Sequence, residues 1–293
     1  MHRRQALISL LAAAWQACAQ PRQAEFRGKA ALQHARRAAA FGPRPPGSPA
    51  LDELRAYILG ELAKLRCEVI RDEFTANTPL GPIKMVNLIA RFPGRSGRAV
   101  AVSGHYETKW MPDIRFVGAN DGGASTGFLL ELARVMSHRE FRNEILIVFF
   151  DGEESFGPWS ENDGLYGSRH LAARWAADST LSRLRALINV DMIGDHELGI
   201  LREMHSTAWL RELVWRTASE LGLGRYFLDQ AAWVEDDHIP FLRRGVSAVN
   251  LIDFDYGPRN SFWHTEQDTP DKLSAVSFAV VGRVVLEVLR RLE

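Results

Sequence analysis

The strongest constraint on the fold is an apolar run, residues 145–150, that leads directly into the acidic segment Asp151-Gly152-Glu153-Glu154. A strand that is apolar at every position is typically buried on both faces of a sheet. The carboxylates then follow the end of the strand, which is where α/β folds place their chemistry. Because adjacent side chains point in different directions, Glu153 and Glu154 are suited to separate roles, one moving protons and the other binding a metal. The tetrapeptide alone is equally compatible with a solvated turn.

Potential metal ligands occupy similar positions elsewhere in the chain. Each follows an apolar run that predicts a strand, or precedes an apolar-periodic segment that predicts a helix. Together with Glu154, these candidates are His105 after residues 99–103, Asp121 before 128–136, Asp191 after 186–190, and His264 after 246–252. One such residue is more often structural than functional, but five in these positions indicate a metal site. Histidine and carboxylate ligands without cysteine suit a catalytic Zn²⁺, or less well Mn²⁺, with an open coordination position.

The composition is that of a globular chain with balanced charge. Of 293 residues, 46% are hydrophobic, which is enough for a sizeable core. Lysine plus arginine and aspartate plus glutamate number 36 each, so the net charge is zero, which argues against a nucleic-acid-binding protein. No linker, internal repeat or low-complexity tract divides the chain. We therefore expect residues 24–293 to form a single α/β catalytic domain.

The N-terminus has the pattern of a targeting segment. Residues 2–4 are basic, residues 6–15 are apolar, and Ala17-Cys18-Ala19 fits a small-residue cleavage site. The pattern predicts a signal peptide at residues 1–19 and export to the periplasm or the medium. Lipid anchoring at Cys18 is less favoured, because the residues before it are a poor lead-in. The apolar run is too short to span a bilayer, and no later stretch is long enough.

The remaining pattern alternates helices with strands. The predicted helices cover residues 24–41, 49–65, 123–138, 165–177, 207–221, 238–244 and 271–292, and the predicted strands cover 67–75 at an edge, 83–92, 99–104, 145–150, 186–193 and 246–252. Ser48 is the expected N-cap of the second helix, with Pro49 at its first position. Asp237 is the expected N-cap of the short helix, and His238 a structural or capping residue. This order predicts a central mixed, mostly parallel β-sheet sandwiched by α-helices.

Six short segments carry a family resemblance. They are Gly104-His105-Tyr106-Glu107, Gly118-Ala119-Asn120-Asp121, Phe149-Phe150-Asp151-Gly152-Glu153-Glu154, Leu165-Tyr166-Gly167-Ser168-Arg169-His170-Leu171, Asp236-Asp237-His238-Ile239-Pro240-Phe241-Leu242 and Trp263-His264-Thr265. Over about residues 27–292 the chain resembles the animal-type glutaminyl-peptide cyclotransferases, or glutaminyl cyclases, which belong to the M28-like zinc aminopeptidase superfamily. The first three segments and the last occur widely in that superfamily, whereas those at 165–171 and 236–242 are more specific to the cyclases.

The resemblance implies a role for each site residue. The implied roles are zinc ligand for Asp121, Glu154 and His264, general acid/base for Glu153, hydrogen-bonding partner around Glu153 for Asp191 and Asp236, and pocket lining for Trp159 and Trp263. The peptide bond between Asp121 and Gly122 would be cis, as is typical of the superfamily. Glu107 stands where the family usually has Asp, and the paired cysteines of the animal enzymes are absent. The pocket phenylalanine of the family aligns equally with Phe254, Tyr256 or Phe262.

The implied activity is cyclisation of the N-terminal glutamine of peptides and proteins to pyroglutamate, with one zinc ion per chain and release of ammonia. The alternative is a two-zinc M28-type aminopeptidase, in which His105 and Asp191 join the ligands and Asp121 bridges the metals. A metal-free binding module on the same fold would have lost some of these ligands, and the chain retains them all. The sequence leaves the oligomeric state open.

Overall fold

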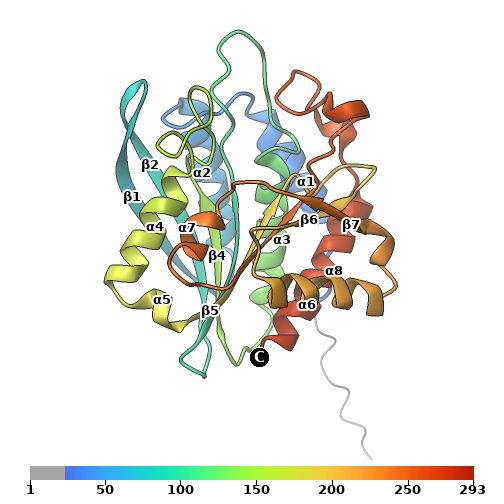
Figure 1. Cartoon of the computed structure of the whole chain (residues 1–293). Coiled ribbons are helices and arrows are strands. Elements are labelled where there is room, and N and C mark those ends of the chain that lie inside the picture. The colour runs from blue at the N-terminus through green and yellow to red at the C-terminus, as the bar shows by residue number, and fades with distance from the viewer. Residues whose placement is uncertain (1–23) are drawn as a thin grey trace, which may run out of the picture.

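The structure is a computed structural model that describes residues 24–293, so the predicted signal peptide lies outside the described residues. The centre of the molecule is a six-stranded sheet in the order β1-β2-β4-β3-β5-β8 (Figure 1). Its strands are β1 (Glu68–Thr78), β2 (Gly81–Phe92), β3 (Ala99–His105), β4 (Glu144–Phe150), β5 (Leu184–Asp191) and β8 (Ala248–Ile252). A separate two-stranded sheet pairs β6 (Ile200–Glu203) with β7 (Phe227–Ala232).

The six-stranded sheet is mixed and mostly parallel, as the order of elements predicts. β3 runs parallel to β4 and to β5, and β5 runs parallel to β8. The β1–β2 and β2–β4 pairs are antiparallel, and β1 is the predicted edge strand. The carboxyl ends of the four parallel strands therefore meet at one edge of the sheet.

Helices cover both faces of this sheet (Figure 1). They are α1 (Gly28–Ala40), α2 (Pro49–Leu62), α3 (Gly123–Met136), α4 (Tyr166–Ala177), α5 (Thr180–Arg183), α6 (Ala208–Glu220), α7 (Ile239–Leu242) and α8 (Ala275–Arg291). Strand side chains alternate between the two apolar layers. In β3, Val100 and Val102 pack in the cluster with α1, α3 and α8, while Ala99 and Ala101 pack under α4 and α7. Because each face meets a hydrophobic layer, the strands appear in the sequence as continuous apolar runs.

Helix starts follow the predicted capping in one case and depart from it in another. The Oγ of Ser48 accepts a hydrogen bond of 3.2 Å from the N–H of Leu51 at the start of α2, as predicted. The prediction that Asp237 caps the short helix is wrong, because α7 begins after His238 and has no side-chain cap. The N–H of Ile239 bonds to the backbone carbonyl of Asp236 instead, at 2.9 Å, so the helix start is satisfied by the backbone.

The sequence pattern did not predict the strands β6 and β7, and it placed the start of α8 too early. β6 has four residues and β7 is exposed along most of its length, so neither shows a continuous apolar run. The helix predicted from residue 271 begins at Ala275, where the Ser274 side chain caps it. β7 leads directly into Trp233, a residue at the mouth of the cavity described below.

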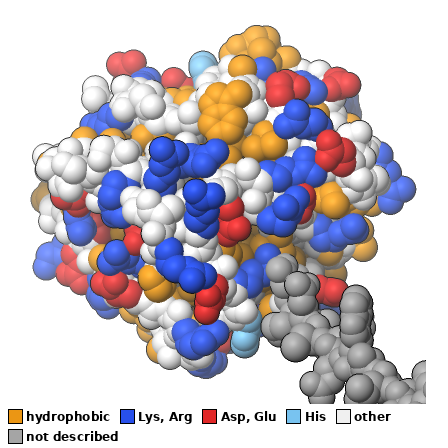
Figure 2. Space-filling model, turned by 90° about the horizontal axis from the view of Figure 1, so that it is seen from below, with side chains coloured by type: hydrophobic (Ala, Val, Ile, Leu, Met, Phe, Trp, Pro, Cys, Tyr) orange, Lys and Arg blue, Asp and Glu red, His pale blue; other side chains and the backbone are white. Residues whose placement is uncertain are grey.

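Charged side chains of both signs are spread over the surface. On the face seen in Figure 2, lysine and arginine are interspersed with aspartate and glutamate, in keeping with the net charge of zero. Within residues 24–293, no helix combines the length and the apolar character that crossing a bilayer requires.

Candidate active site

The predicted site residues gather at the carboxyl edge of the sheet. His105 ends β3 and Asp191 ends β5, while Glu153 and Glu154 follow the end of β4. Asp121 lies in the loop just before α3. Parallel strands bring their carboxyl ends together, so residues far apart in the chain meet here.

Asp121, Glu154 and His264 converge on one another. One potential ligand atom from each lies within 4.8 Å of the other two. Nε2 of His264 is 2.8 Å from Oε1 of Glu154 and 3.2 Å from Oδ2 of Asp121. Trp263 stacks on the His264 ring with centroids 4.1 Å apart. The backbone of His264 has a φ of 53°, a conformation that non-glycine residues adopt rarely and often at functional sites.

The donor set of this triad fits a zinc ion. One histidine and two carboxylates beside a cavity match the ligands of a catalytic zinc site with an open position. Oδ2 of Asp121 is buried and makes no hydrogen bond among the described residues. Burial alone would lower the pKa of His264, but the nearby carboxylates of Glu154 and Asp121 outweigh it and raise the pKa to about 10. The site therefore carries a surplus of negative charge that a bound cation would neutralise.

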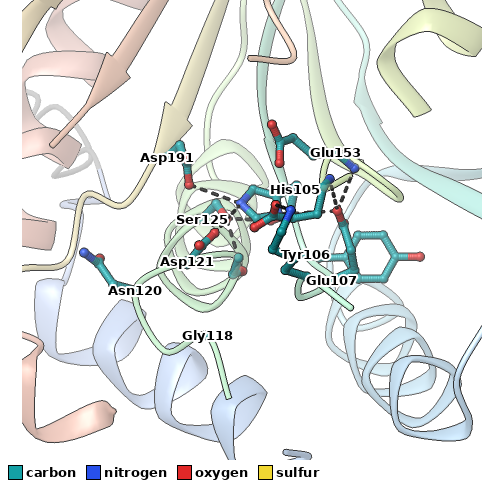
Figure 3. A network of polar contacts seen from close by, with 12 residues as sticks. His105, Tyr106, Glu107, Gly118, Asn120, Asp121, Ser125, Glu153 and Asp191 are labelled. Carbon is teal, nitrogen blue, oxygen red and sulfur yellow. Dashed lines mark hydrogen bonds and ion pairs between the residues drawn. The ribbon is translucent and has the colours of Figure 1, made fainter. Parts of the chain in front are cut away.

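A second group of potential ligands adjoins the first. His105, Asp121 and Asp191 also offer atoms within 4.8 Å of one another. Nε2 of His105 lies 3.2 Å from Oδ1 of Asp121 and 3.2 Å from Oδ1 of Asp191 (Figure 3). His105 is 1% exposed and is not among the residues that line the cavity, whereas Asp121 and Asp191 are. The two groups share Asp121. His264 of the first group lines the cavity, whereas His105 of the second group does not.

The loop that carries Asp121 is held by Asp268. The carboxylate of Asp268 accepts hydrogen bonds from the N–H groups of Asn120, at 2.8 Å, and Asp121, at 3.1 Å. The hydroxyl of Tyr256 donates to the same carboxylate at 2.9 Å. Sequence reasoning missed Asp268, because a single aspartate in a polar segment follows no strand and belongs to no periodic pattern.

The predicted cis peptide bond after Asp121 is wrong, since no peptide bond within residues 24–293 is cis. Gly122 turns the chain by another route, with a φ of 76° that glycine adopts without steric penalty. A Cβ at this position would lie 2.1 Å from the carbonyl oxygen of Glu107. Glycine is therefore required at position 122 for two reasons: its φ is positive, and the backbone of Glu107 lies too close for a side chain.

Glu153 lies beside the triad and is held through its backbone. The N–H groups of Glu153 and Glu154 donate to Oε1 of Glu107, at 2.6 and 3.2 Å (Figure 3). Glu107, at the position where the family usually has Asp, thus braces the turn after β4. The Glu153 side chain lines the cavity and is 8% exposed. Burial, together with the charge of Glu154, raises the pKa of Glu153 well above its ordinary value.

Asp191 and Asp236 line the same cavity, but neither forms the expected hydrogen bond with Glu153. Asp191 pairs with His105, and Oδ2 of Asp236 accepts from the side-chain amide of Asn250 at 2.7 Å. Among the described residues no hydrogen bond joins Asp191, Asp236 and Glu153 to one another, so their coupling is electrostatic. Burial raises the pKa of Asp191 to about 7, against the opposing effect of His105. Asp191 and Asp236 are thus each held by a separate partner, His105 and Asn250.

Asn250 belongs to a row of polar side chains that crosses the sheet. Ser103, Asn189 and Asn250 occupy paired positions on β3, β5 and β8. The Ser103 hydroxyl donates to Oδ1 of Asn189 at 2.8 Å, and Nδ2 of Asn189 donates to Oδ1 of Asn250 at 3.1 Å. Sequence reasoning missed this row. Each member interrupts an apolar run, which is a visible signal, but the strand register alone aligns the three interruptions.

A cavity of about 470 Å³ opens beside the triad. Trp159 and Trp263, the two tryptophans expected in the pocket, both line it. Of the three alternatives for the pocket phenylalanine, Phe254 lines the cavity, and its ring meets that of Trp263 edge-on with centroids 5.0 Å apart. Tyr256 is fully buried against Asp268 instead.

Two further lining residues were not predicted. Nζ of Lys109 lies 3.2 Å from Oε2 of Glu154 and 2.9 Å from the carbonyl oxygen of Ser155. Its place two residues after the segment at 104–107 is a signal that could have found it. Trp233 also lines the cavity and is 70% exposed.

The fold and the site place the chain in a known class of proteins. Residues 87–289 match the model of peptidase family M28, to which the chain therefore belongs. The chain is 32% identical over 271 residues to a glutaminyl-peptide cyclotransferase of Drosophila melanogaster, an alignment that covers 83% of this chain and 75% of that protein. A crystal structure of a glutaminyl cyclase from an Acidobacteriales bacterium matches with a TM-score of 0.89 at 40% identity, over 95% of this chain and 99% of the other. Within family M28, the chain belongs to the glutaminyl-peptide cyclotransferases.

The same fold also occurs in a peptidase. A Zn-dependent exopeptidase from Parabacteroides distasonis matches with a TM-score of 0.82 at 25% identity, over 91% of this chain and 99% of the other. These findings confirm the predicted fold class and family. Because one fold supports both activities, the choice between them depends on the site.

Proposed function

We propose that this protein cyclises the N-terminal glutamine of peptides and proteins to pyroglutamate and releases ammonia. The observation that carries the proposal is the position of Glu153 beside the triad of Asp121, Glu154 and His264 in one cavity. A group that can move protons and a group that can bind a metal therefore face the same substrate. The relatives and the bacterial structure described above bear names for this activity.

Asp121, Glu154 and His264 would hold one zinc ion. When bound, zinc supplies Lewis-acid polarisation of the glutamine side-chain carbonyl. Lys109 contacts the Glu154 oxygen that does not face His264, and so holds that carboxylate in place.

The reaction needs no nucleophile from the protein. The α-amine of the substrate attacks its own side-chain carbonyl carbon, which forms the ring C–N bond, and the bond to the amide nitrogen breaks. Glu153 takes a proton from the attacking nitrogen and returns a proton to the leaving nitrogen, which departs as ammonia. Its raised pKa suits it to holding a proton between these two transfers.

Aromatic side chains confine the reacting glutamine. Trp263 and Phe254 form an edge-to-face pair in the cavity wall, next to His264. These apolar side chains exclude water from the carbonyl carbon. The α-amine of the substrate, rather than water, is then the nucleophile that attacks.

The two-zinc aminopeptidase is the second candidate, and the grouping of His105 with Asp121 and Asp191 is the observation that favours it. In that reading a second metal would replace the present pairing of His105 with the two carboxylates. His105 does not line the cavity, however, and cyclisation requires one metal only. We therefore favour a single zinc ion.

Incubation of the purified protein with the peptide Gln-Ala-Ala amide tests the proposal. We expect mass spectrometry to show loss of one ammonia from an otherwise intact peptide, at a rate far above the uncatalysed cyclisation. Release of free glutamine would identify an aminopeptidase instead. The matched control is Glu153→Gln, which should retain the metal and lose the reaction.

We further propose that the protein is exported. The proposal rests on the basic, apolar and small-residue pattern of residues 1–19. N-terminal sequencing of the protein recovered from outside the cytoplasm should begin at or near Gln20; a chain recovered with its first residues intact would contradict it.

A further inference from the structure

Arg55 and Asp151 form a buried ion pair behind the turn that carries Glu153 and Glu154. Asp151 is the first residue after β4, so it begins this turn, and Arg55 lies on α2. Nη2 of Arg55 is 3.0 Å from Oδ2 of Asp151. Arg55 is 8% exposed and Asp151 is fully buried. Neither residue lines the cavity, so any effect of the pair on the reaction must pass through the turn.

We infer that Arg55 and Asp151 are positioning residues, which fix the turn after β4 and thereby aim the Glu153 carboxylate at the substrate. The inference rests on the proposed function, in which Glu153 moves the proton. It extends that proposal from the cavity wall to a pair of charges outside the cavity.

Asp151 ties the start of the turn to strand β2. Its Oδ2 accepts a hydrogen bond of 2.8 Å from the N–H of Val86 and lies 3.2 Å from the hydroxyl of Tyr106. Its own N–H donates to Oδ1 of Asn87 at 3.1 Å. The side chain and the backbone of Asp151 are therefore both held, and together they fix the direction in which the chain leaves β4.

The turn that follows is tight and is braced at its other end. Gly152 has a φ of 74°, and a Cβ at this position would lie 2.6 Å from Sδ of Met85 on β2. Glu107 accepts the N–H of Glu153 at 2.6 Å. Because only one residue separates Asp151 from Glu153, a displacement of Asp151 is transmitted directly to Glu153.

The guanidinium of Arg55 holds three groups at once. Its Nε donates to the hydroxyl of Tyr106 at 2.9 Å, its Nη2 donates to Asp151, and its Nη1 pairs with Asp52. Tyr106 is the residue before Glu107, so Arg55 also contacts the segment that braces the turn. The fixed fork of an arginine can make these contacts together, whereas a lysine offers a single nitrogen.

Stability alone does not account for this pair. Removing two charges from water costs free energy that their mutual attraction roughly offsets, so a buried ion pair adds little net stability. Neutral side chains can often replace both members of such a pair without loss of folding, whereas loss of one member is strongly destabilising. We therefore expect replacement of both charges to preserve the fold and to impair the reaction.

Ammonia release from Gln-Ala-Ala amide by two variants tests the inference. Arg55→Met leaves the Asp151 carboxyl buried without its cation and should lower both the urea midpoint and kcat. The double variant Arg55→Met, Asp151→Asn removes both charges and keeps an acceptor for Val86. We expect its urea midpoint to return close to that of the wild type while kcat stays about tenfold lower and KM changes by less than about twofold. Zinc should be retained, because Lys109 also holds Glu154.

The matched control is the ion pair at the other end of the same strand. Nε of Arg91 lies 2.7 Å from Oε2 of Glu144, the first residue of β4, and neither residue lines the cavity. Arg91→Met should change kcat by less than about twofold. If the double variant regains the wild-type kcat with its stability, or if Arg91→Met lowers kcat as much as Arg55→Met does, the Arg55 pair acts through stability alone and the inference is wrong.

If the double variant does not fold, Arg55→Lys takes its place, because it keeps the positive charge and loses the fork. A lower kcat at unchanged zinc content then supports positioning, and a wild-type kcat overturns it.

A readout that does not depend on the reaction separates this inference from the proposed function. If the wild type releases no ammonia, the proposed function is wrong, and crystal structures of the wild type and of the folded variant decide the role of the pair. A displaced Glu153 side chain and a broken hydrogen bond between Glu153 and Glu107 support the inference. A turn that superposes on that of the wild type overturns it.

Discussion

The side-chain amide of Asn250 donates a hydrogen bond of 2.7 Å to Oδ2 of Asp236. Both residues are buried, and Oδ1 of Asn250 in turn accepts from Asn189. The amide of Asn250 cannot flip without turning its oxygen toward a carboxylate. The strand β8 therefore fixes the orientation of Asp236 at the cavity wall near Glu153.

Replacing Asn250 with leucine should loosen Asp236 without removing it. We expect kcat to fall by about tenfold with a smaller change in KM, because the buried carboxylate loses a hydrogen bond worth roughly 1.5–3 kcal/mol. Steady-state kinetics measure both. Ser103→Ala, at the far end of the polar row, is the control and should have a much smaller effect on kcat. An equal loss in both variants would indicate that the row acts through stability alone.

Glu153→Gln and Glu154→Gln should have different effects on turnover and on zinc content. Glu153→Gln removes a proton carrier, so turnover should fall by on the order of 10²-fold or more while zinc is retained. Glu154→Gln removes a ligand and should release zinc. Metal analysis of the purified variants, alongside ammonia release, separates the two. Zinc loss in Glu153→Gln together with zinc retention in Glu154→Gln would reverse the assignment.

His105→Ala distinguishes one metal from two. In the single-zinc reading, His105 is a buried residue that pairs with Asp121 and Asp191, so the variant should keep one zinc ion and measurable cyclisation, with some loss of stability. Metal content per chain and ammonia release are the measurements. If zinc falls from two equivalents to one and peptide-bond cleavage is abolished, the protein is a two-metal peptidase.

Asp253 should make stability depend on pH. It is 1% exposed and accepts the N–H of Gly199 at 2.8 Å, and burial raises its pKa from 3.8 to about 7. A carboxyl group whose pKa is raised by folding holds its proton more tightly in the folded state. Its contribution to the free energy of unfolding therefore falls as the pH rises from about 4 to about 7, and is constant above.

Asp253→Asn keeps an acceptor for Gly199 and cannot ionise. We expect the free energy of unfolding of the variant, relative to wild type, to increase by roughly 2 kcal/mol between about pH 5 and about pH 8. Urea unfolding at both pH values measures this, and other ionisable groups cancel because they are common to both proteins. A difference that does not change with pH would show that Asp253 is not protonated in the folded state.

The sequence by itself determined the six strands of the central sheet and most of the candidate site. Continuous apolar runs such as β4 can be stable only between two apolar layers, and that condition places the acidic residues that follow them at the edge of the sheet. Local steric and capping rules also identified Ser48 as the N-cap of α2. The segments around Asp121, Glu154 and His264 were sufficient to predict that these residues meet.

Tertiary structure decided what local pattern cannot encode. Ser103, Asn189 and Asn250 form one polar row because strand register aligns them, and Asp268 reaches the Asp121 loop from 147 positions away in the chain. Phe254 rather than Tyr256 lines the cavity because Tyr256 is needed by Asp268. The peptide bond after Asp121 and the cap of α7 were predicted wrongly for the same reason: the backbone satisfied each turn through its own neighbours, Gly122 by a positive φ and Ile239 by the carbonyl of Asp236. The polar row and the contact of Asp268 with the Asp121 loop, by contrast, depend on which groups the fold brings together, and those groups are distant in sequence.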